Sequence, residues 1–400
     1  MKPKVVIMGL GYIGLPTAAL IASKGIQVHG VDVNEKVVKT INEGQVHIVE
    51  PDLEGLVNHV VKKGYLKAST QPQEADVFLI AVPTPFKDDY RPDLSYVKSA
   101  IKMIIPYFKE GNLVIVESTS PIGTTEKMFN LIFQERPDLE GKIYMAYCPE
   151  RVLPGKILYE LEHNDRVIGG INPESTKKAK EFYALFVKGE LFETDAKTAE
   201  MCKLVENAYR DVNIAFANEL SLICEKAGIN VWELIKLANR HPRVNILQPG
   251  VGVGGHCIAV DPWFLITQYP EESRLMQTAR EVNLYKTEWV INKIKEEAKN
   301  FEKKHGRKPK IACLGLTYKP DVDDLRESPA FYIVRRLIKD GFEILPVEPN
   351  VKRVESLVLY NLDDALKEAD IAVFLVKHKI FTTLNLISEK IEILDFCGIF

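Results

Sequence analysis

The stretch Lys4-Val5-Val6-Ile7-Met8-Gly9-Leu10-Gly11-Tyr12-Ile13-Gly14 decides the fold of the first part of the chain. It begins as a short, β-rich and largely apolar run, typical of a strand buried inside a parallel sheet. Three glycines spaced as GxGxxG follow directly, and residues Leu15–Ser23 then predict a helix. A second predicted strand, Gln27–Val31, ends at Asp32. Strand, glycine turn, helix, strand and acid together are the pattern of a Rossmann-type dinucleotide site.

The residues of this pattern also predict which cofactor binds. Gly9, Gly11 and Gly14 permit a tight turn and let a pyrophosphate approach the backbone at the helix N-terminus. The carboxylate of Asp32 can accept hydrogen bonds from an adenosine ribose, and it would repel a 2′-phosphate. We therefore expect NAD rather than NADP.

Later strands of the same sheet are expected to bring further polar residues to the cofactor. They are predicted at Asp76–Val82, Leu113–Val116 and Ile143–Tyr147. Ligands of open parallel sheets bind beyond the carboxyl ends of the strands, where Thr84, Thr119, Glu150 and Arg151 follow. For the two threonines, an alternative role is to cap the next helices.

The middle third of the chain is helical by pattern. No glycine or proline occurs from Thr198 to about Glu225, which predicts one long helix. Its expected buried face is the apolar stripe Met201, Val205, Ala208, Val212 and Phe216. Lys203, Asn207 and Arg210 form a second stripe nearly opposite the first, which is either functional or simply a solvated face.

A glycine-rich loop, Gly250–Pro262, carries the candidate nucleophile Cys257. Glycines allow close approach to a ligand and leave backbone N–H groups free to face an anion. A thiol on such a loop, with Asp261 four residues on, is a plausible covalent catalyst. The alternative is a tight turn with a buried, inert cysteine.

The N-terminal plan recurs after the charged linker Lys303–Pro309. Strands are predicted at Ile311–Leu316, Glu343–Glu348, Glu368–Val376 and Ile391–Asp395. This second domain lacks the full glycine fingerprint, so a mononucleotide-type ligand is expected, with Lys319 and Arg326 placed to reach phosphates. The predicted fold is α/β, with two Rossmann-like doubly wound domains (residues 1–195 and 308–400) joined by a central all-helical domain (residues 196–300).

Composition limits the classes of function. The net charge of −3 over 400 residues gives no reason to expect nucleic acid or an anionic membrane as a partner. The six cysteines are scattered, without CxxC pairs or zinc-type spacing, so we expect no metal site and a reducing, cytoplasmic environment.

The chemistry of a thiol beside a nucleotide cofactor indicates more than alcohol oxidation. A thiolate can hold an aldehyde as a thiohemiacetal, from which hydride loss gives a thioester that water cleaves. In this hypothesis Lys203 stabilises the developing oxyanion, and Asp261 positions or deprotonates the water.

The sequence resembles the UDP-glucose/GDP-mannose dehydrogenase family of NAD-dependent, four-electron enzymes. The resemblance is carried by Gly9–Pro16, His47–Leu53, Tyr147–Gly155, Ala199–Leu204, His241–Gly250, Gly254–Cys257 and Asp324–Pro329. Within the family, the motifs are most similar to the branch acting on UDP-N-acetyl-D-mannosamine. The resemblance therefore implies oxidation of that sugar at C6 to the uronate.

The resemblance also implies roles for residues. The catalytic set would be Cys257 as nucleophile and Lys203, with Glu150, Asn207 and Asp261 as supporting polar residues. The NAD contacts would be Tyr12, Ile13, Asp32, Thr84, Thr119 and Arg326. The UDP-sugar contacts would be Arg151, Val152, Lys203, Asn207, Arg210, His241, Arg243, Gly254, Tyr318 and Lys319. A homodimer or larger assembly packed on the long helix is implied, in which Arg243 acts in trans.

Several alternatives stay open at this stage. The same chemistry can act on UDP-N-acetylglucosamine or UDP-glucose. A two-electron hydroxyacid dehydrogenase or a non-catalytic nucleotide-sugar sensor would share part of the pattern. The chain also departs from the branch near its last strand, where Cys397 stands in place of a basic residue that helps to hold the substrate. That cysteine is either a regulatory thiol or a buried structural one.

Overall fold

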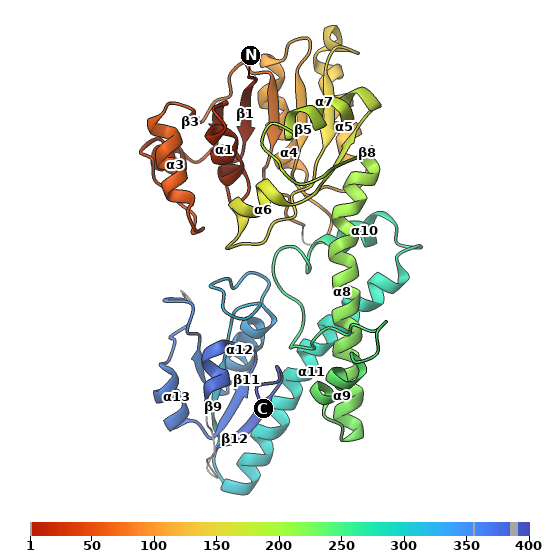
Figure 1. Cartoon of the computed structure of the whole chain (residues 1–400). Helices are drawn as coiled ribbons and strands as arrows, with labels where there is room; N and C mark the ends of the chain where they lie inside the picture. The colour runs from red at the N-terminus through yellow and green to blue at the C-terminus, as the bar shows by residue number, and fades with distance from the viewer. Residues whose placement is uncertain (1, 88, 355–356, 385–390) are drawn as a thin grey trace. The chain divides into compact units, whose positions relative to one another are not determined.

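The computed structural model describes residues 2–87, 89–354, 357–384 and 391–400. It divides into two compact units, Met1–Glu206 and Asn207–Phe400. The boundary falls inside one long helix, α8 (Ala196–Ala227), so the helix contributes to both units (Figure 1).

The first unit is built on one sheet in the order β3-β2-β1-β4-β5-β6-β7-β8. Its strands are β1 (Lys4–Met8), β2 (Gln27–Val31), β3 (Leu66–Ser69), β4 (Val77–Ile80), β5 (Leu113–Val116), β6 (Tyr144–Tyr147), β7 (Arg166–Gly170) and β8 (Leu191–Asp195). Neighbouring strands are parallel except at β6 and β7, which pair antiparallel. The order 3-2-1-4-5-6 confirms the predicted Rossmann fold.

Helices cover both faces of this sheet, as a doubly wound fold requires. They are α1 (Gly14–Ser23), α2 (Glu35–Asn42), α3 (Leu53–Lys62), α4 (Ser95–Ile104), α5 (Thr124–Glu135), α6 (Ile157–His163) and α7 (Pro173–Tyr183). Val5 and Ile7 of β1 point into a core shared with α1, α3, α6 and α7. Val6 and Met8 point into a second core with α4 and α5. The apolar run of β1 therefore fills two cores, because alternate side chains of a strand face opposite sides.

The central helices confirm the predicted long helix but correct its buried face. α9 (Val231–Ala238), α10 (Asp261–Gln268) and α11 (Arg274–His305) follow α8. Ala208 is buried as predicted, whereas Phe216 is 53% exposed. The fully buried positions nearby include Asp211 and Asn218.

These buried polar residues exist because α8 meets α11 through hydrogen bonds. Asp211 Oδ1 lies 2.7 Å from Arg280 Nη1 and accepts a hydrogen bond from Asn283 Nδ2 at 2.9 Å. Asn218 Nδ2 donates to Asn283 Oδ1 at 2.9 Å. An apolar periodicity cannot reveal such a contact, since each polar group is tolerated only through its partner.

The second nucleotide-type sheet has the order β10-β9-β11-β12, with every pair parallel. Its strands are β9 (Lys310–Leu314), β10 (Glu343–Val347), β11 (Ile371–Phe374) and β12 (Glu392–Asp395). α11 and α12 (Pro329–Lys339) cover one face, and α13 (Leu362–Glu368) with the short 3₁₀ helix η3 (Lys379–Thr383) covers the other. The predicted second Rossmann-like domain is thus confirmed.

None of the helices in the described residues combines the length and the apolar character that crossing a bilayer needs.

Candidate active site

The three glycines of the turn after β1 differ in what surrounds them. Gly9 and Gly14 are packed against the backbone, whereas Gly11 has open space on its side-chain side. Gly9 has φ +93°, and a Cβ there would lie 2.7 Å from the Ala81 carbonyl oxygen. A Cβ on Gly14 would lie 1.8 Å from the Gly9 carbonyl oxygen. These two glycines are required by the packing of the turn. A Cβ on Gly11 would meet no protein atom within 4 Å, so its open side suits the close approach of a pyrophosphate.

Asp32 holds this turn as well as ending β2. Its Oδ2 accepts a hydrogen bond from Leu10 N–H at 3.0 Å, and its Oδ1 accepts one from Asn34 N–H at 2.9 Å. The carboxylate therefore lies beside the glycine turn, in the place expected of a ribose ligand. Tyr12, which is 48% exposed, and Ile13 lie on the turn that leads into α1.

The loops after β4 and β5 lie together. Ser118 Oγ donates to the Val82 carbonyl at 2.7 Å and thereby joins the two strand ends. Thr84 and Thr119 are half-buried there. The capping alternative is wrong, because α4 starts after Leu94 and α5 after Gly123, without a side-chain cap at either helix. Both hydroxyls therefore remain candidates for contacting the cofactor.

Glu150 belongs to a buried charged cluster. Its Oε2 lies 2.9 Å from Arg166 Nη1, and its Oε1 accepts a hydrogen bond from Arg151 N–H at 2.7 Å. Arg166 Nη1 is also 4.0 Å from Glu117 Oε1, which accepts a 2.5 Å hydrogen bond from the Tyr183 hydroxyl. Burial raises the pKa of Glu117 to about 7, against the attraction of Arg166 and with added repulsion from Glu150. One guanidinium thus serves two carboxylates.

Arg151 and Val152, two predicted sugar contacts, already have partners in the first unit. Arg151 Nη1 forms a 2.7 Å ion pair with Glu206, and Nη2 donates to the Asp165 carbonyl at 2.6 Å. Val152 packs against the hydrophobic core that contains α1. A substrate would have to share or replace the Arg151 contacts.

The three polar residues of the α8 stripe differ in their burial and contacts. Lys203 is half-buried and lies one turn before Asn207, so both side chains leave the same side of the helix. Asn207 Nδ2 donates to Asp261 Oδ2 at 2.6 Å, and Asp261 is only 3% exposed. Arg210, the third member, is exposed. The structure therefore brings together Asn207 and Asp261, two of the supporting polar residues that the resemblance implies.

Cys257 sits in the turn that starts α10. Its carbonyl accepts the Asp261 N–H at 2.8 Å, so the thiol and the carboxylate lie on one short turn. Cys257 lies in a tight turn, as the alternative reading of the loop expects, but the residue is half-buried rather than buried. The start of the loop is fixed by Gly250 N–H, which donates to Asn218 Oδ1 at 2.9 Å.

The glycines before Cys257 are required by close packing, because a side chain at Gly254 or Gly255 would collide with neighbouring residues. A Cβ on Gly254 would lie 2.5 Å from the Glu327 carbonyl oxygen, and a Cβ on Gly255 would lie 2.9 Å from the Tyr318 ring. Gly255 also has φ +81°, a conformation that side chains disfavour. The loop is thereby pressed against the segment that carries Tyr318. Burial raises the pKa of Tyr318, and the charges of Asp324 and Cys257 add to the rise.

Lys319 and Arg326 follow on the same segment. Lys319 Nζ lies 5.8 Å from the centroid of the Tyr318 ring. Arg326 Nη2 forms a 2.6 Å ion pair with Asp324. His241 and Arg243 lie on the exposed turn after α9, where Arg243 N–H points to His241 Nδ1 at 3.4 Å.

Three matches to family models decide the assignment of this chain. Residues 3–187 match the NAD binding domain of the UDP-glucose/GDP-mannose dehydrogenase family, residues 197–285 its central domain, and residues 312–398 its UDP binding domain. The chain belongs to the UDP-glucose/GDP-mannose dehydrogenase family. It is therefore a dehydrogenase with NAD as its cofactor, and it contains the UDP-binding domain of the family.

Relatives of this dehydrogenase cover nearly its whole length. The UDP-N-acetyl-D-mannosamine dehydrogenase of Escherichia coli K12 is 55% identical over 95% of this chain and 94% of its own. The NDP-N-acetyl-D-galactosaminuronic acid dehydrogenase of Ralstonia nicotianae is 54% identical over 95% of this chain and 92% of its own. The solved UDP-D-ManNAc dehydrogenase of Pyrococcus horikoshii is 40% identical, with a TM-score of 0.89 over 99% of this chain and 96% of its own.

The segment around Cys397 lies next to a lysine that precedes it by twenty residues in the sequence, Lys377. Lys377 Nζ donates a hydrogen bond to the Gly398 carbonyl, one residue after the cysteine. Burial raises the pKa of the Cys397 thiol, and the charge of Asp395 adds to the rise. A raised pKa disfavours the reactive thiolate, which favours the structural role over the regulatory one.

The sequence did not predict three buried or partly buried residues that contact the candidate site residues or their loops, namely Arg166, Tyr183 and Glu50. Arg166 and Tyr183 follow Glu150 by many positions, and no motif linked them to it. Glu50 lies in the motif His47–Leu53, and the sequence predicted no role for it. Its carboxylate accepts N–H bonds from Gly155 and Ile157 at 2.8 and 2.7 Å, and so fixes the loop after Glu150.

Proposed function

We propose that this dehydrogenase oxidises UDP-N-acetyl-D-mannosamine at C6 to the uronate, with two NAD reduced per turnover. The observation that carries the proposal is the turn at Cys257. Half-buried Cys257 shares this turn with the buried Asp261, whose carboxylate accepts a hydrogen bond from Asn207 of α8. Relatives named UDP-N-acetyl-D-mannosamine dehydrogenase at 54–55% identity support this choice of sugar.

The first oxidation removes a hydride from C6 and a proton from its hydroxyl, which leaves an aldehyde. Bound NAD supplies the acceptor for the hydride. Glu150 is proposed to take part in proton removal, and Lys203 to stabilise negative charge on the substrate oxygen.

The second oxidation is proposed to pass through the sulfur of Cys257. The thiolate adds to the aldehyde carbon, and the alkoxide formed gains a proton to give a thiohemiacetal. Loss of a second hydride, for which a second NAD would be the acceptor, and of the hydroxyl proton leaves a thioester. Water then attacks the thioester carbon, and the C–S bond breaks to give the uronate and the free thiol. Asp261, fixed by Asn207, is proposed to orient that water.

NAD and UDP-sugar contacts are proposed as implied by the family. The proposed NAD contacts are Gly9, Gly11, Tyr12, Ile13, Gly14, Asp32, Thr84, Thr119 and Arg326. The proposed sugar-nucleotide contacts are Arg151, Val152, Lys203, Asn207, Arg210, His241, Arg243, Gly254, Tyr318 and Lys319. The open side of Gly11 and the Asp32 carboxylate beside the turn support the first set. We retain the division at residues 1–195, 196–300 and 308–400 as part of this proposal.

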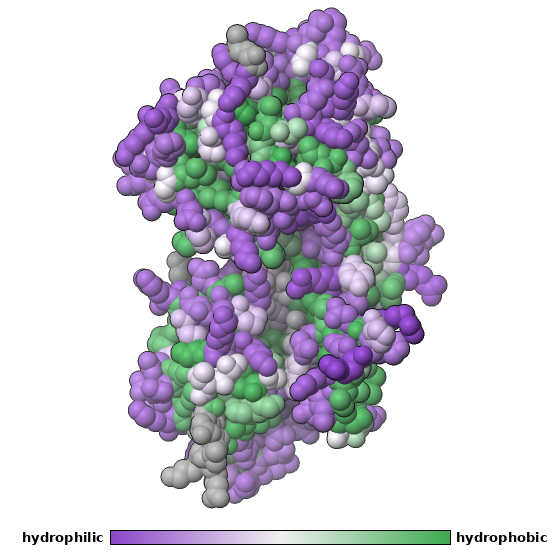
Figure 2. All heavy atoms as spheres, viewed as in Figure 1, coloured by the Kyte–Doolittle hydropathy of each residue, from purple (hydrophilic) through white to green (hydrophobic). Residues whose placement is uncertain are grey.

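We also propose a homodimer packed on α8, in which Arg243 reaches the partner's site. Tyr209, Phe216 and Ile223 recur every seven residues on α8 and are 72%, 53% and 56% exposed. Figure 2 shows hydrophobic surface over α9 at the lower right, in the same unit. Large apolar side chains that repeat along one helix face are typical of a helix–helix interface.

A second sugar is favoured by one specific observation. The NDP-N-acetyl-D-galactosaminuronic acid dehydrogenase of Ralstonia nicotianae is as similar to this chain as several of the mannosamine enzymes. Both kinds of sugar carry an acetamido group and differ in hydroxyl and amide stereochemistry. The alternative is therefore the same chemistry on a galacto-configured UDP-sugar.

The test is a panel of UDP-N-acetylmannosamine, UDP-N-acetylgalactosamine, UDP-N-acetylglucosamine and UDP-glucose, assayed for NADH and for uronate. The proposal predicts the highest kcat/KM for the mannosamine substrate. Cys257→Ala should release no uronate, while Cys202→Ala, another half-buried cysteine, should remain active. Normal uronate release by Cys257→Ala would refute the covalent step, and a preference for another sugar would refute the substrate.

A further inference from the structure

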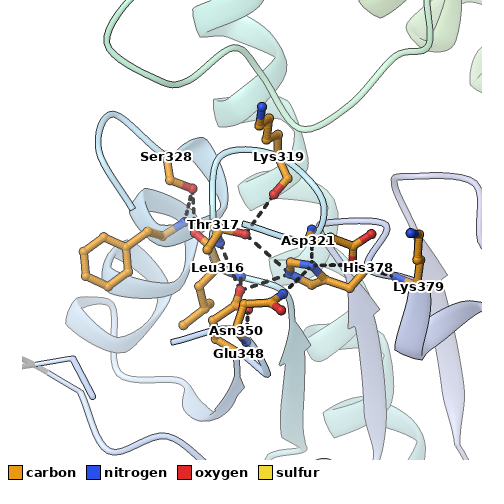
Figure 3. A network of polar contacts seen from close by, with 10 residues as sticks. Leu316, Thr317, Lys319, Asp321, Ser328, Glu348, Asn350, His378 and Lys379 are labelled. Atoms are coloured by element: carbon orange, nitrogen blue, oxygen red, sulfur yellow. Dashed lines mark hydrogen bonds and ion pairs between the residues drawn. The ribbon is translucent and has the colours of Figure 1, made fainter. Parts of the chain in front are cut away.

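The loop that carries Tyr318 and Lys319 is held by a buried polar cluster with no role in the chemistry proposed above. The loop, Leu316–Asp321, follows β9. Leu316 N–H and Thr317 N–H donate to Glu348 Oε2 at 2.7 and 3.1 Å. At the other end, Asp321 N–H donates to His378 Nδ1 at 2.9 Å (Figure 3).

His378 links the two ends of the loop. It is fully buried, and its Nε2 lies 3.1 Å from Glu348 Oε2. Because Nδ1 accepts from Asp321, the ring proton is assigned to Nε2, which donates to Glu348. Burial raises the pKa of Glu348, but hydrogen bonds from His378 and from the N–H groups of Leu316 and Asn350 outweigh it and leave a lowered pKa.

The turn at Asp321 needs this support. Asp321 has φ +57°, a left-handed conformation uncommon for residues other than glycine. Its N–H is bound by His378, and its Oδ1 accepts Lys379 N–H at 3.0 Å. Two neighbouring residues of one segment therefore fix both the backbone and the side chain of this turn.

The same cluster fixes the residue proposed to meet the substrate. Thr317 Oγ1 donates to the Lys319 carbonyl at 3.0 Å and lies 3.4 Å from His378 Nε2. Figure 3 shows the Lys319 side chain pointing away from His378, on the opposite side from the buried cluster. The Lys319 carbonyl is thus fixed by Thr317 of the buried cluster, while the Lys319 ammonium points away from that cluster.

We propose that His378 is a positioning residue for the UDP-sugar: it fixes the Leu316–Asp321 loop and thereby sets how tightly Lys319 binds the diphosphate. This inference rests on the proposed function for the identity of the ligand. A nucleoside diphosphate is the chemistry that a presented ammonium at the end of a nucleotide-type sheet recognises.

The test compares two substitutions of His378. His378→Phe keeps a ring of similar shape but removes the acceptor for Asp321 N–H. The Asp321 N–H would then lack its acceptor, which disfavours the loop conformation that presents Lys319. We therefore expect the KM for the UDP-sugar to rise on the order of tenfold. The kcat and the KM for NAD should stay unchanged. His378→Asn places an amide oxygen near the position of Nδ1, so it should recover much of the lost affinity. His305→Asn, at an exposed histidine of the same unit, is the matched control.

Calorimetric titration with UDP alone gives a second measurement. Affinity should rank unchanged protein first, His378→Asn next and His378→Phe last. An unchanged KM and UDP affinity in His378→Phe would overturn the inference, as would equal losses in both variants. If the unchanged protein made no NADH with any UDP-sugar, the proposed function would fail instead, while the UDP ranking would still report on His378.

Discussion

At the scale of single residues, the cluster around Arg166 shows how a site can hold charge away from water. A buried guanidinium lies 2.9 Å from Glu150 and 4.0 Å from Glu117, while Tyr183 donates to Glu117. Two buried carboxylates facing one cation cannot both be ionised without strong repulsion. Burial is the main reason that the pKa of Glu117 is raised, and repulsion from Glu150 adds to it against the attraction of Arg166. Arg166 forms its shorter ion pair with Glu150.

Glu117 should make stability depend on pH. Its pKa is raised from 4.5 to about 7, so between these values the folded protein holds a proton that the unfolded chain has released. The free energy of unfolding should therefore fall as pH rises through this window. Glu117→Gln, which mimics the neutral acid, should make that fall shallower. Urea unfolding at pH 5 and pH 7.5 measures the difference.

The control for this prediction is Glu140→Gln at an exposed site, which should keep the pH dependence of the unchanged protein. An identical slope in Glu117→Gln and the unchanged protein would show that a different group titrates.

At the scale of elements, α8 combines a buried polar side with an exposed apolar one. Asp211 and Asn218 bind α11, and Asn218 also holds Gly250 at the start of the Cys257 loop. The helix itself could be predicted, because twenty-eight residues from Thr198 to Glu225 contain no breaker. Its buried side could not, since Asp211 and Asn218 become favourable only once Arg280 and Asn283 face them.

Phe216 tests the proposed role of the apolar side of α8. Phe216→Glu places a charge in the proposed helix–helix contact, where burying it without a partner is strongly unfavourable. We expect the dimer to dissociate in analytical ultracentrifugation, with the far-UV circular dichroism unchanged. Lys98→Glu, an exposed charge reversal on α4, should leave the assembly intact. A Phe216→Glu protein with unaltered mass would rule out this face as the interface.

At the scale of the whole molecule, the sequence predicted both nucleotide-type sheets but not all their strands. Strands β1, β2 and β5 could be located to the residue. β1 and β5 are largely apolar runs, and β2 is buried from Val28 to Val31. β3, β7 and β8 were missed, and β7 ends in two glycines that weaken its strand pattern. Leu66–Ser69 alternates buried and exposed residues, and β8 is mostly exposed, so neither is an apolar run. Arg166 was missed as a partner of Glu150 because the pairing of β7 with β6, not a sequence motif, brings them together.

The central claim is that Cys257 carries an aldehyde through a second oxidation at one site. The most direct measurement is the ratio of NADH formed to UDP-N-acetylmannosamine consumed, with the sugar nucleotide limiting and uronate quantified in parallel. The account predicts two NADH for each sugar and one uronate, without free aldehyde. One NADH for each sugar, with aldehyde as the final product, would contradict it.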